Sequence, residues 1–248
     1  MSWTRLSLLL LFLAGRAFAA LPDEIQVYTD DLEAAGERGI ELHVNTTPGG
    51  RSRPGYPGEV PTFHGLRVTP EISWGLGHDM DWGLYLPFVR SAEGAYWFAG
   101  PKLRFKWLPV RPAEGGAGRF LGVNLELAHV QSRFEEARTR GEIRPIGGWR
   151  GERWLFAFNP ILEFDLAGGQ NGVAMFSPAF KAARDVGNAH ALGVEYYGEL
   201  GRLSGFAPRA EQAHTLYLTL DTPRLNFGIG RGFSGQADRW TIKTILSF

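Results

Sequence analysis

A two-residue alternation of apolar and polar side chains recurs along the chain and continues to its last residue. The final ten residues read RWTIKTILSF, in which Trp240, Ile242, Leu246 and Phe248 share one parity and Lys243 has the other. Successive side chains of a β-strand point to opposite faces, so this spacing predicts a strand with one mostly apolar face. A soluble sandwich and a membrane barrel both contain such strands, and the rest of the chain must distinguish them.

The same alternation, bounded by turn residues, predicts about twelve strands. In FLGVNLEL, for example, Leu121, Val123 and Leu125 alternate with Gly122 and Asn124. The 33 glycines and the 13% aromatic content also suit a chain built from many short strands. The predicted strands cover residues 38–47, 64–75, 80–90, 95–109, 119–131, 138–150, 153–166, 174–185, 189–200, 213–221, 224–232 and 239–248.

The connections between the predicted strands favour a membrane barrel. Short turns, such as Gly151–Glu152 and Thr222–Pro223, alternate with mostly longer loops, such as Pro48–Phe63 and Gly201–Gln212. Outer-membrane barrels have short periplasmic turns and longer outer loops, and their closure satisfies every backbone group in hydrocarbon. We therefore expect an all-β, transmembrane antiparallel up-and-down β-barrel of about 12 strands. A periplasmic sandwich or a lipocalin-like barrel is the alternative.

Five tryptophans are predicted to form an aromatic girdle at the periplasmic rim, because two pairs flank short turns, the fifth closes its strand at the same end, and Trp favours the level of the lipid headgroups. They are Trp74, Trp82, Trp107, Trp149 and Trp154. The last strand would end at the same rim. Its residues Phe248, Leu246 and Ile242 are the expected signal for the barrel-assembly machinery.

Residues 1–19 are predicted to be a secretory signal peptide. The basic residue Arg5 precedes a short apolar run, and Ala17-Phe18-Ala19 supplies a small-x-small cleavage site. The run is shorter than the roughly 20 apolar residues of a helical membrane span. We expect residues 20–37 to be an N-terminal periplasmic segment and residues 38–248 to form the barrel.

The charge balance and the absence of cysteine exclude several classes of function. The chain has 26 basic and 26 acidic residues; Arg5 and Arg16 lie in the predicted signal peptide, which leaves 24 basic residues and a net charge near −2. This balance gives no electrostatic reason to bind nucleic acid. With no Cys, the chain forms no disulfide and has no thiol chemistry.

The signal sequence, the alternating strands and the tail RWTIKTILSF resemble those of Gram-negative outer-membrane β-barrels. Within that group, the chain resembles the channel and transporter barrels that include the family associated with the meta pathway of phenol degradation. The resemblance implies a place in the cell outer membrane, contact with its lipid and lipopolysaccharide, and passage of small organic solutes, with anionic or phenolic solutes among them. It implies no cofactor and supplies no residue-level site.

If the apolar parity faces lipid, the polar parity lines the lumen. The charges there could pair and hold the barrel closed, as a structural barrel or as one that binds a ligand or partner through its outer loops. Alternatively, they could line a narrow path in which Lys102, Arg104 and Lys106 attract anions. Glu126, on the next predicted strand, is a candidate partner for this basic stripe. The predicted lumen-lining residues are Lys102, Arg104, Lys106, Glu41, His43, Arg67, Glu71, Glu126, Arg144, Glu163, Lys181 and Glu195.

Two segments outside the predicted strands carry clustered charge. Leu21–Glu37 contains six acidic residues and no basic one. We expect it to be a solvated periplasmic tail; the alternative is that it folds back over the basic stripe. In the outer loop, Arg51 and Arg53 are candidates for contact with lipopolysaccharide phosphates, although a plain surface loop is the simpler interpretation.

No set of residues predicts an enzyme. Barrel lipases and deacylases place Ser and His two residues apart on one strand face, and the chain has no His-x-Ser. We expect no enzymatic activity, and a lipid-modifying barrel enzyme is a distant alternative. Glu41, His43 and Glu71 could share a metal ion on adjacent strands, but His is more common within a polar ladder, and we expect no metal.

Overall fold

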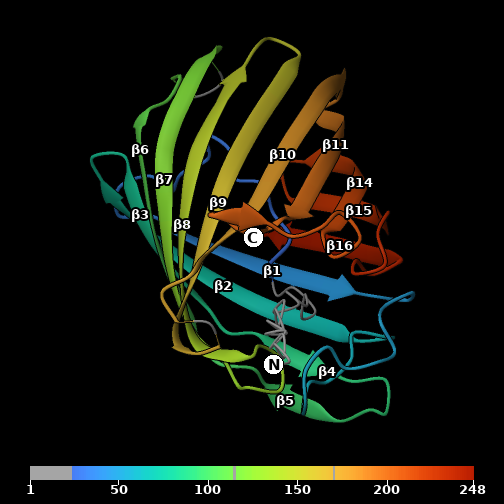
Figure 1. Ribbon diagram of the computed structural model, residues 1–248. Coiled ribbons are helices and arrows are strands. Elements are labelled where there is room, and N and C mark those ends of the chain that lie inside the picture. Colours follow the sequence, from blue (N-terminus) through green and yellow to red (C-terminus); the bar gives the residue numbers. More distant parts are fainter. Residues whose placement is uncertain (1–23, 114–115, 170) are drawn as a thin grey trace, which may run out of the picture.

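The described chain forms one antiparallel sheet that closes on itself (Figure 1). The computed structural model describes residues 24–113, 116–169 and 171–248, and the predicted signal peptide lies outside these ranges. The strands are β1 (Arg38–Thr46), β2 (Leu66–Gly77), β3 (Met80–Tyr85), β4 (Phe88–Arg90), β5 (Tyr96–Phe98), β6 (Lys102–Val110), β7 (Gly118–His129), β8 (Ala137–Arg150), β9 (Trp154–Gly168), β10 (Ala174–Gly187), β11 (His190–Glu199), β12 (Gly201–Arg202), β13 (Gly205–Phe206), β14 (Ala213–Thr222), β15 (Leu225–Gly232) and β16 (Trp240–Ser247).

Strand β1 closes the barrel because it pairs with β2 on one side and with β16 on the other. Strands β3 and β4 both pair with β2 and together make one interrupted strand of the barrel wall. Strands β5 and β6 make the next one in the same way. Each continuous or interrupted strand of the wall is called here a stave. Strands β12 and β13 form a small hairpin, and β12 pairs with Met175 near the first residue of β10. The 16 described strands therefore make twelve staves, and the prediction of an antiparallel barrel of about 12 strands is confirmed.

The staves differ from the predicted strands in two places. The predicted strands 80–90 and 95–109 are each interrupted, at Leu86–Pro87 and at Ala99–Pro101. Proline has no N–H to donate to the ladder, and Gly100 has a φ of 130°, so neither segment continues regular pairing. The β12–β13 hairpin lies in a stretch that was predicted to be an irregular loop.

The outer surface of the barrel is apolar and the interior is polar, as the parity predicted. Leu121, Leu192 and Leu218 are 58%, 54% and 68% exposed, whereas Asn124 and Lys243 are fully buried inside. An apolar outer face with every stave paired is what a hydrocarbon environment requires. Within the described ranges, no helix is long and apolar enough to cross a bilayer.

The two ends of the barrel have different connections. One end, called here the short-turn end, includes the two-residue turns His78–Asp79 and Asn188–Ala189, in which both φ values are positive as in a type I′ turn. The opposite, long-loop end carries residues 47–65 and 200–212 among its connections. In bacterial outer-membrane barrels it is the end with the short turns that faces the periplasm.

The predicted girdle residues lie on the outer surface near the short-turn end. Trp107, Trp149 and Trp154 are each 43–44% exposed, and Trp74 stacks on Trp82 with ring centroids 4.2 Å apart. At the same end, the exposed Phe248 donates its backbone N–H to the Ile40 carbonyl at 3.0 Å, while Ile242 and Leu246 are half-buried on the outer face. Their role in barrel assembly stays a prediction.

The first part of the segment Glu24–Glu37, called here the lumenal segment, lies inside the barrel, so the expectation of a solvated tail was wrong for that part, whereas Asp31 and residues 34–37 are exposed. In Figure 1 this blue chain passes behind β7–β10. Ile25, Val27 and Tyr28 are each only 4% exposed. The alternative interpretation, in which the segment folds back over the basic residues, is the arrangement observed. Composition alone could not decide, because the partners of the segment lie on strands far away in the sequence.

Candidate functional site

The lumenal segment separates two cavities inside the barrel. The inner cavity, toward the short-turn end, has a volume of about 640 Å³ and is lined in part by Tyr28 and Glu33. The outer cavity, toward the long-loop end, has a volume of about 310 Å³ and is lined in part by Glu24 and Ile25. Of the described residues, only Gln26 lines both cavities. The segment therefore obstructs the lumen between Glu24 and Tyr28.

The backbone of the lumenal segment is held by one asparagine of the wall. Tyr28 donates its N–H to Oδ1 of Asn159 on β9 at 2.7 Å, and Nδ2 of Asn159 donates to the Tyr28 carbonyl at 3.1 Å. Asn159 is fully buried. A buried peptide group without partners costs free energy, so this pair satisfies both polar groups of Tyr28 at the point where the segment crosses the lumen.

Cationic side chains of the wall bind two further carbonyls of the segment. Nη1 of Arg144 donates to the Gln26 carbonyl at 3.2 Å, and Nζ of Lys243 donates to the Ile25 carbonyl at 3.0 Å. The Arg144 guanidinium also lies 4.4 Å from the centre of the Tyr28 ring, within the range of a cation–π contact. Hydrogen bonds to charged donors are the stronger kind, so these contacts fix the position of the segment.

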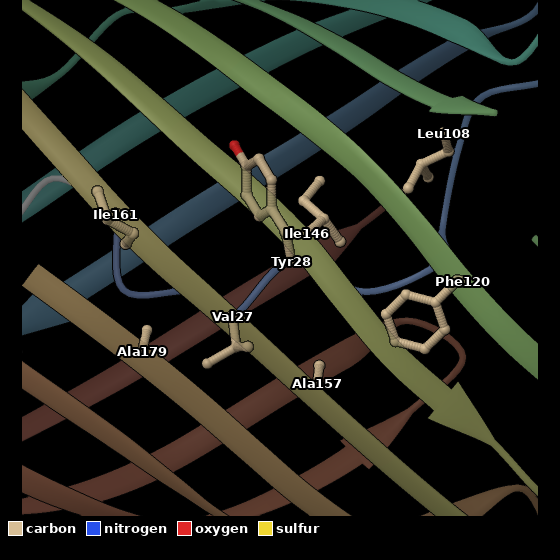
Figure 2. Packing of buried hydrophobic residues seen from close by; sticks show 8 residues of the cluster. All are labelled: Val27, Tyr28, Leu108, Phe120, Ile146, Ala157, Ile161 and Ala179. Carbon is tan, nitrogen blue, oxygen red and sulfur yellow. The ribbon is translucent and has the colours of Figure 1, made fainter. Parts of the chain in front are cut away.

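An apolar patch on the inner wall gives the segment a docking surface. Figure 2 shows Val27 and Tyr28 next to wall residues that include Phe120, Ile146 and Ile161, and all five are buried. Burying an aliphatic or aromatic side chain of this size contributes about 1.5–3 kcal/mol relative to exposure. In a lumen that is otherwise polar, this patch would face water if the segment left.

Two glycines of the wall make room for the segment. Gly36 donates its N–H to the Gly75 carbonyl at 2.9 Å, and Gly75 donates its own N–H to the Glu37 carbonyl at 3.0 Å. A Cβ atom on Gly75 would collide with the Ala34 carbonyl, and one on Gly39 would collide with the Glu33 carboxylate. Close approach of another backbone is a common reason for glycine within a strand.

The structure places the predicted lumen-lining residues inside the barrel and divides them between the two cavities. Glu41, Glu71, Arg104, Lys106, Lys181 and Glu195 line the inner cavity, whereas Arg67, Lys102, Glu126, Arg144 and Glu163 line the outer one. His43 is fully buried beside Glu71, with its Nε2 3.2 Å from Oε2 of that residue.

The basic stripe of Lys102, Arg104 and Lys106 is neutralised. Nζ of Lys102 lies 3.1 Å from Oε2 of Glu126 and 3.6 Å from Oε2 of Glu24 in the lumenal segment.

The other two cations of the stripe have partners on β2 and β3. Arg104 donates to Oε1 of Glu71 at 2.7 Å and also pairs with Asp81, and Lys106 lies 3.5 Å from Oδ2 of Asp81. Glu126 was thus the correct partner for Lys102 but not for Arg104, although Arg104 and Glu126 are paired in register. The stripe therefore presents no excess positive charge to a solute in this state.

Sequence reasoning missed Asp81 and Asn159, which matter to this arrangement. Asp81 precedes Trp82 and so has the lumen parity of β3, which would have been enough to find it. Asn159 has the lumen parity of β9, but its role depends on the lumenal segment, which no local pattern connects to β9.

Arg51 is not available for lipopolysaccharide, contrary to one sequence-based possibility. Its side chain is 12% exposed, and Nη2 lies 3.0 Å from Oε1 of Glu59, whose side chain is fully buried. The backbone N–H of Arg51 donates to Asp238 Oδ1 at 2.9 Å and to Thr62 Oγ1 at 2.8 Å. These contacts join loop 47–65 to the loop before β16. Arg53, by contrast, is exposed.

These features define a class: a closed, lipid-facing β-barrel whose charged lumen is obstructed by its own N-terminal segment. No family model and no curated protein sequence match the chain. Among solved structures, the fold is similar to that of an outer membrane channel from Pseudomonas putida F1, with a TM-score of 0.58 and 13% identity over 88% of this chain and 97% of that chain. LpxR from Salmonella typhimurium matches with a TM-score of 0.39 and 10% identity, over 85% of this chain and 99% of that chain.

Proposed function

We propose that the protein is an outer-membrane channel for small organic solutes in which the lumenal segment closes the pathway. The observation that carries this proposal is the pair of cavities, one on each side of Gln26. A structural barrel has no need for solvent-sized space on both sides of an internal obstruction. The similarity in fold to an outer membrane channel supports the proposal and the outer-membrane location.

The charge of the outer cavity bears on the class of solute. Its lining contains nine acidic and four basic side chains, so acidic groups outnumber basic ones. Acidic linings favour cations in narrow pores. The sequence-based preference for anions rested on the basic stripe, which is paired in the structure. We therefore propose that neutral molecules, small phenols included, and cations enter more readily than anions.

The test is a conductance measurement in planar bilayers on the mature chain and on a variant that lacks residues 20–32. This deletion removes the contacts of Glu24–Leu32 and keeps the anchor at Gly36 and Gly75. We expect rare or small openings for the full chain and larger, more frequent openings for the variant, because the two cavities would join. Liposome swelling with neutral phenolic solutes should change in the same direction.

A closed structural barrel is the second candidate, and the ion pairs of the lumen favour it. Glu195 pairs with both Lys181 and Lys243, and Arg144 pairs with Glu142 at 2.6 Å. If neither the full chain nor the deletion variant conducts ions or passes solutes, although both are folded, the channel proposal is wrong and the structural barrel takes its place.

A further inference from the structure

Three potential metal ligands meet on the lumen face of β1 and β2. Glu41 of β1 lies directly opposite Glu71 of β2 in the strand register, and His43 follows two residues after Glu41 on the same face. Like charges directly opposite each other on adjacent strands destabilise a sheet unless a cation lies between them. The position between these two carboxylates is therefore one where positive charge is stabilised.

The spacing of the three ligand atoms suits one small metal ion. Nε2 of His43 lies 3.2 Å from Oε2 of Glu71 and 3.6 Å from Oε2 of Glu41, and the three ligand atoms all lie within 4.8 Å of one another. Ligands at about 2.1 Å from a tetrahedral ion are separated from each other by roughly 3.4 Å. A metal ion could thus enter with only small shifts of these side chains.

The second oxygen of each carboxylate is already held by a neighbouring group. Oε1 of Glu41 accepts a hydrogen bond from the Ser247 hydroxyl at 2.9 Å, and Oε1 of Glu71 accepts one from Nε of Arg104 at 2.7 Å. Outer contacts of this kind orient the ligands of metal sites and leave one oxygen of each carboxylate for the ion. Arg104 also pairs with Asp81, which offsets its charge.

The cluster is open to the lumen on one side. Glu41 and Glu71 both line the inner cavity, and the Glu41 side chain is 27% exposed, whereas His43 is fully buried behind them. An ion could therefore arrive through the inner cavity and keep water ligands there. One imidazole and two carboxylates are a ligand set that suits borderline divalent ions such as Zn²⁺.

We propose that Glu41, His43 and Glu71 form a binding site for one divalent transition-metal ion of the Zn²⁺ type, which links β1 to β2 and faces the inner cavity. The two carboxylates and a dication would together be neutral. The site is built from residues of β1 and β2 in the wall, so its test does not depend on the proposed channel function.

The test uses the full mature chain, folded in detergent and freed of metal with EDTA. Zn²⁺ binding is measured by titration calorimetry, and Co²⁺ serves as a spectroscopic probe of ligand geometry. We expect one saturable ion per chain and a higher unfolding temperature with Zn²⁺. His43→Gln should weaken the affinity at least about tenfold, since losing even an outer contact has an effect of that size.

Two further variants make the outcome decisive. Glu41→Gln should also weaken binding, and it provides the same test of the site if His43→Gln does not fold. His214→Gln, which alters a histidine bonded to Tyr196 and Gln212, is the matched control and should leave binding unchanged. The proposal is overturned if the chain binds no stoichiometric ion, or if the His43 and Glu41 variants bind as well as the control. Conductance measured in EDTA tests the channel separately.

Discussion

Asn159 holds both the N–H and the carbonyl of Tyr28, although the two residues are 131 positions apart in the sequence. One side chain of the wall thus takes the place of a pairing strand where the segment crosses the lumen. The position of the lumenal segment depends on such contacts, and they can be removed one at a time.

Asn159→Ala should increase the fraction of time that the channel is open. The substitution leaves two polar groups of the Tyr28 backbone unsatisfied in the closed state, at a cost of about 1–3 kcal/mol, which corresponds to a five- to 150-fold shift in population. Single-channel recording measures the open probability. Asn226→Ala is the control, because Asn226 faces the inner cavity but its amide bonds to Asp221 of the wall. Equal open probabilities for both variants would contradict the role of Asn159.

Gly75→Ala should displace the lumenal segment from the wall and raise conductance. The new Cβ would collide with the Ala34 carbonyl, which is backbone and has little freedom to move aside. Gly147→Ala is the control, since a Cβ there meets only Leu121 at 3.9 Å, an ordinary contact. Protease sensitivity of residues 24–37 in the folded barrel provides a second readout. If the two variants behave alike, the close approach at Gly75 does not hold the segment.

Glu199→Lys should lower the preference of the channel for cations. Glu199 lines the outer cavity, where acidic side chains outnumber basic ones, so replacing it with a cation makes the lining less negative. Reversal potentials in a salt gradient report the ratio of cation to anion permeability. The control is Glu93→Lys, since Glu93 lies in a loop and lines neither cavity. A channel that prefers anions before substitution would refute the proposed charge effect.

Leu218→Arg should destabilise the barrel in lipid by about 2–4 kcal/mol, the cost of a basic side chain facing the middle of the bilayer. Leu218 lies in the middle of β14 and is 68% exposed. Phe233 is 65% exposed but lies in the loop after β15, so Phe233→Arg should have a much smaller effect. Denaturant unfolding in vesicles measures both. Equal destabilisation would mean that the apolar outer face does not lie in lipid.

Asp238, in the loop before β16, should make the packing of the long-loop end depend on pH. Burial raises the pKa of Asp238 above its usual value of 3.8, opposed by its hydrogen bond from Thr62. A raised carboxyl pKa means that the folded loops favour the protonated form. Their stability is therefore greatest below pH 3.8 and falls as the pH rises through the raised value.

Hydrogen exchange of residues 47–65 across that range, expressed as protection relative to the intrinsic exchange rate at each pH, should show weaker protection at higher pH. Asp238→Asn can still accept the hydrogen bonds from Thr62 and Arg51 and should remove much of this dependence. If the slope is the same in the variant, Asp238 is not responsible for the pH dependence.

The barrel was predictable from the sequence because its determinants are local. Alternation in segments such as 119–131 fixes which side chains face lipid, and Trp149 and Trp154 mark the rim through their nearness to a turn. Pro87 and Gly100 are present in the sequence, but the apolar runs around them are typical of continuous strands, so the two interruptions were not predicted. The same alternation also predicted correctly which charged side chains face the lumen.

The obstruction was not predictable, because it depends on contacts between distant residues. An acidic segment such as 20–37 can lie in solvent or in a basic lumen. Its sequence alone does not indicate which of these two environments it occupies. Only the folded barrel brings Asn159, Gly75 and Arg144 to the places where they meet this segment. The pairing of Arg104 with Asp81 rather than Glu126 likewise depends on side-chain direction and not on register.

The direction in which the lumenal segment runs has a mechanical consequence. Glu24 lies at the outer cavity, while Gly36 and Glu37 join the segment to β1 at the short-turn end. A tension applied at Glu37 from the short-turn end would load the bonds at Gly75 first and those of Tyr28 later, so the contacts would break one after another. A push from the long-loop end would instead load all of them together. The obstruction should therefore yield more easily to force from the short-turn end than from the long-loop end.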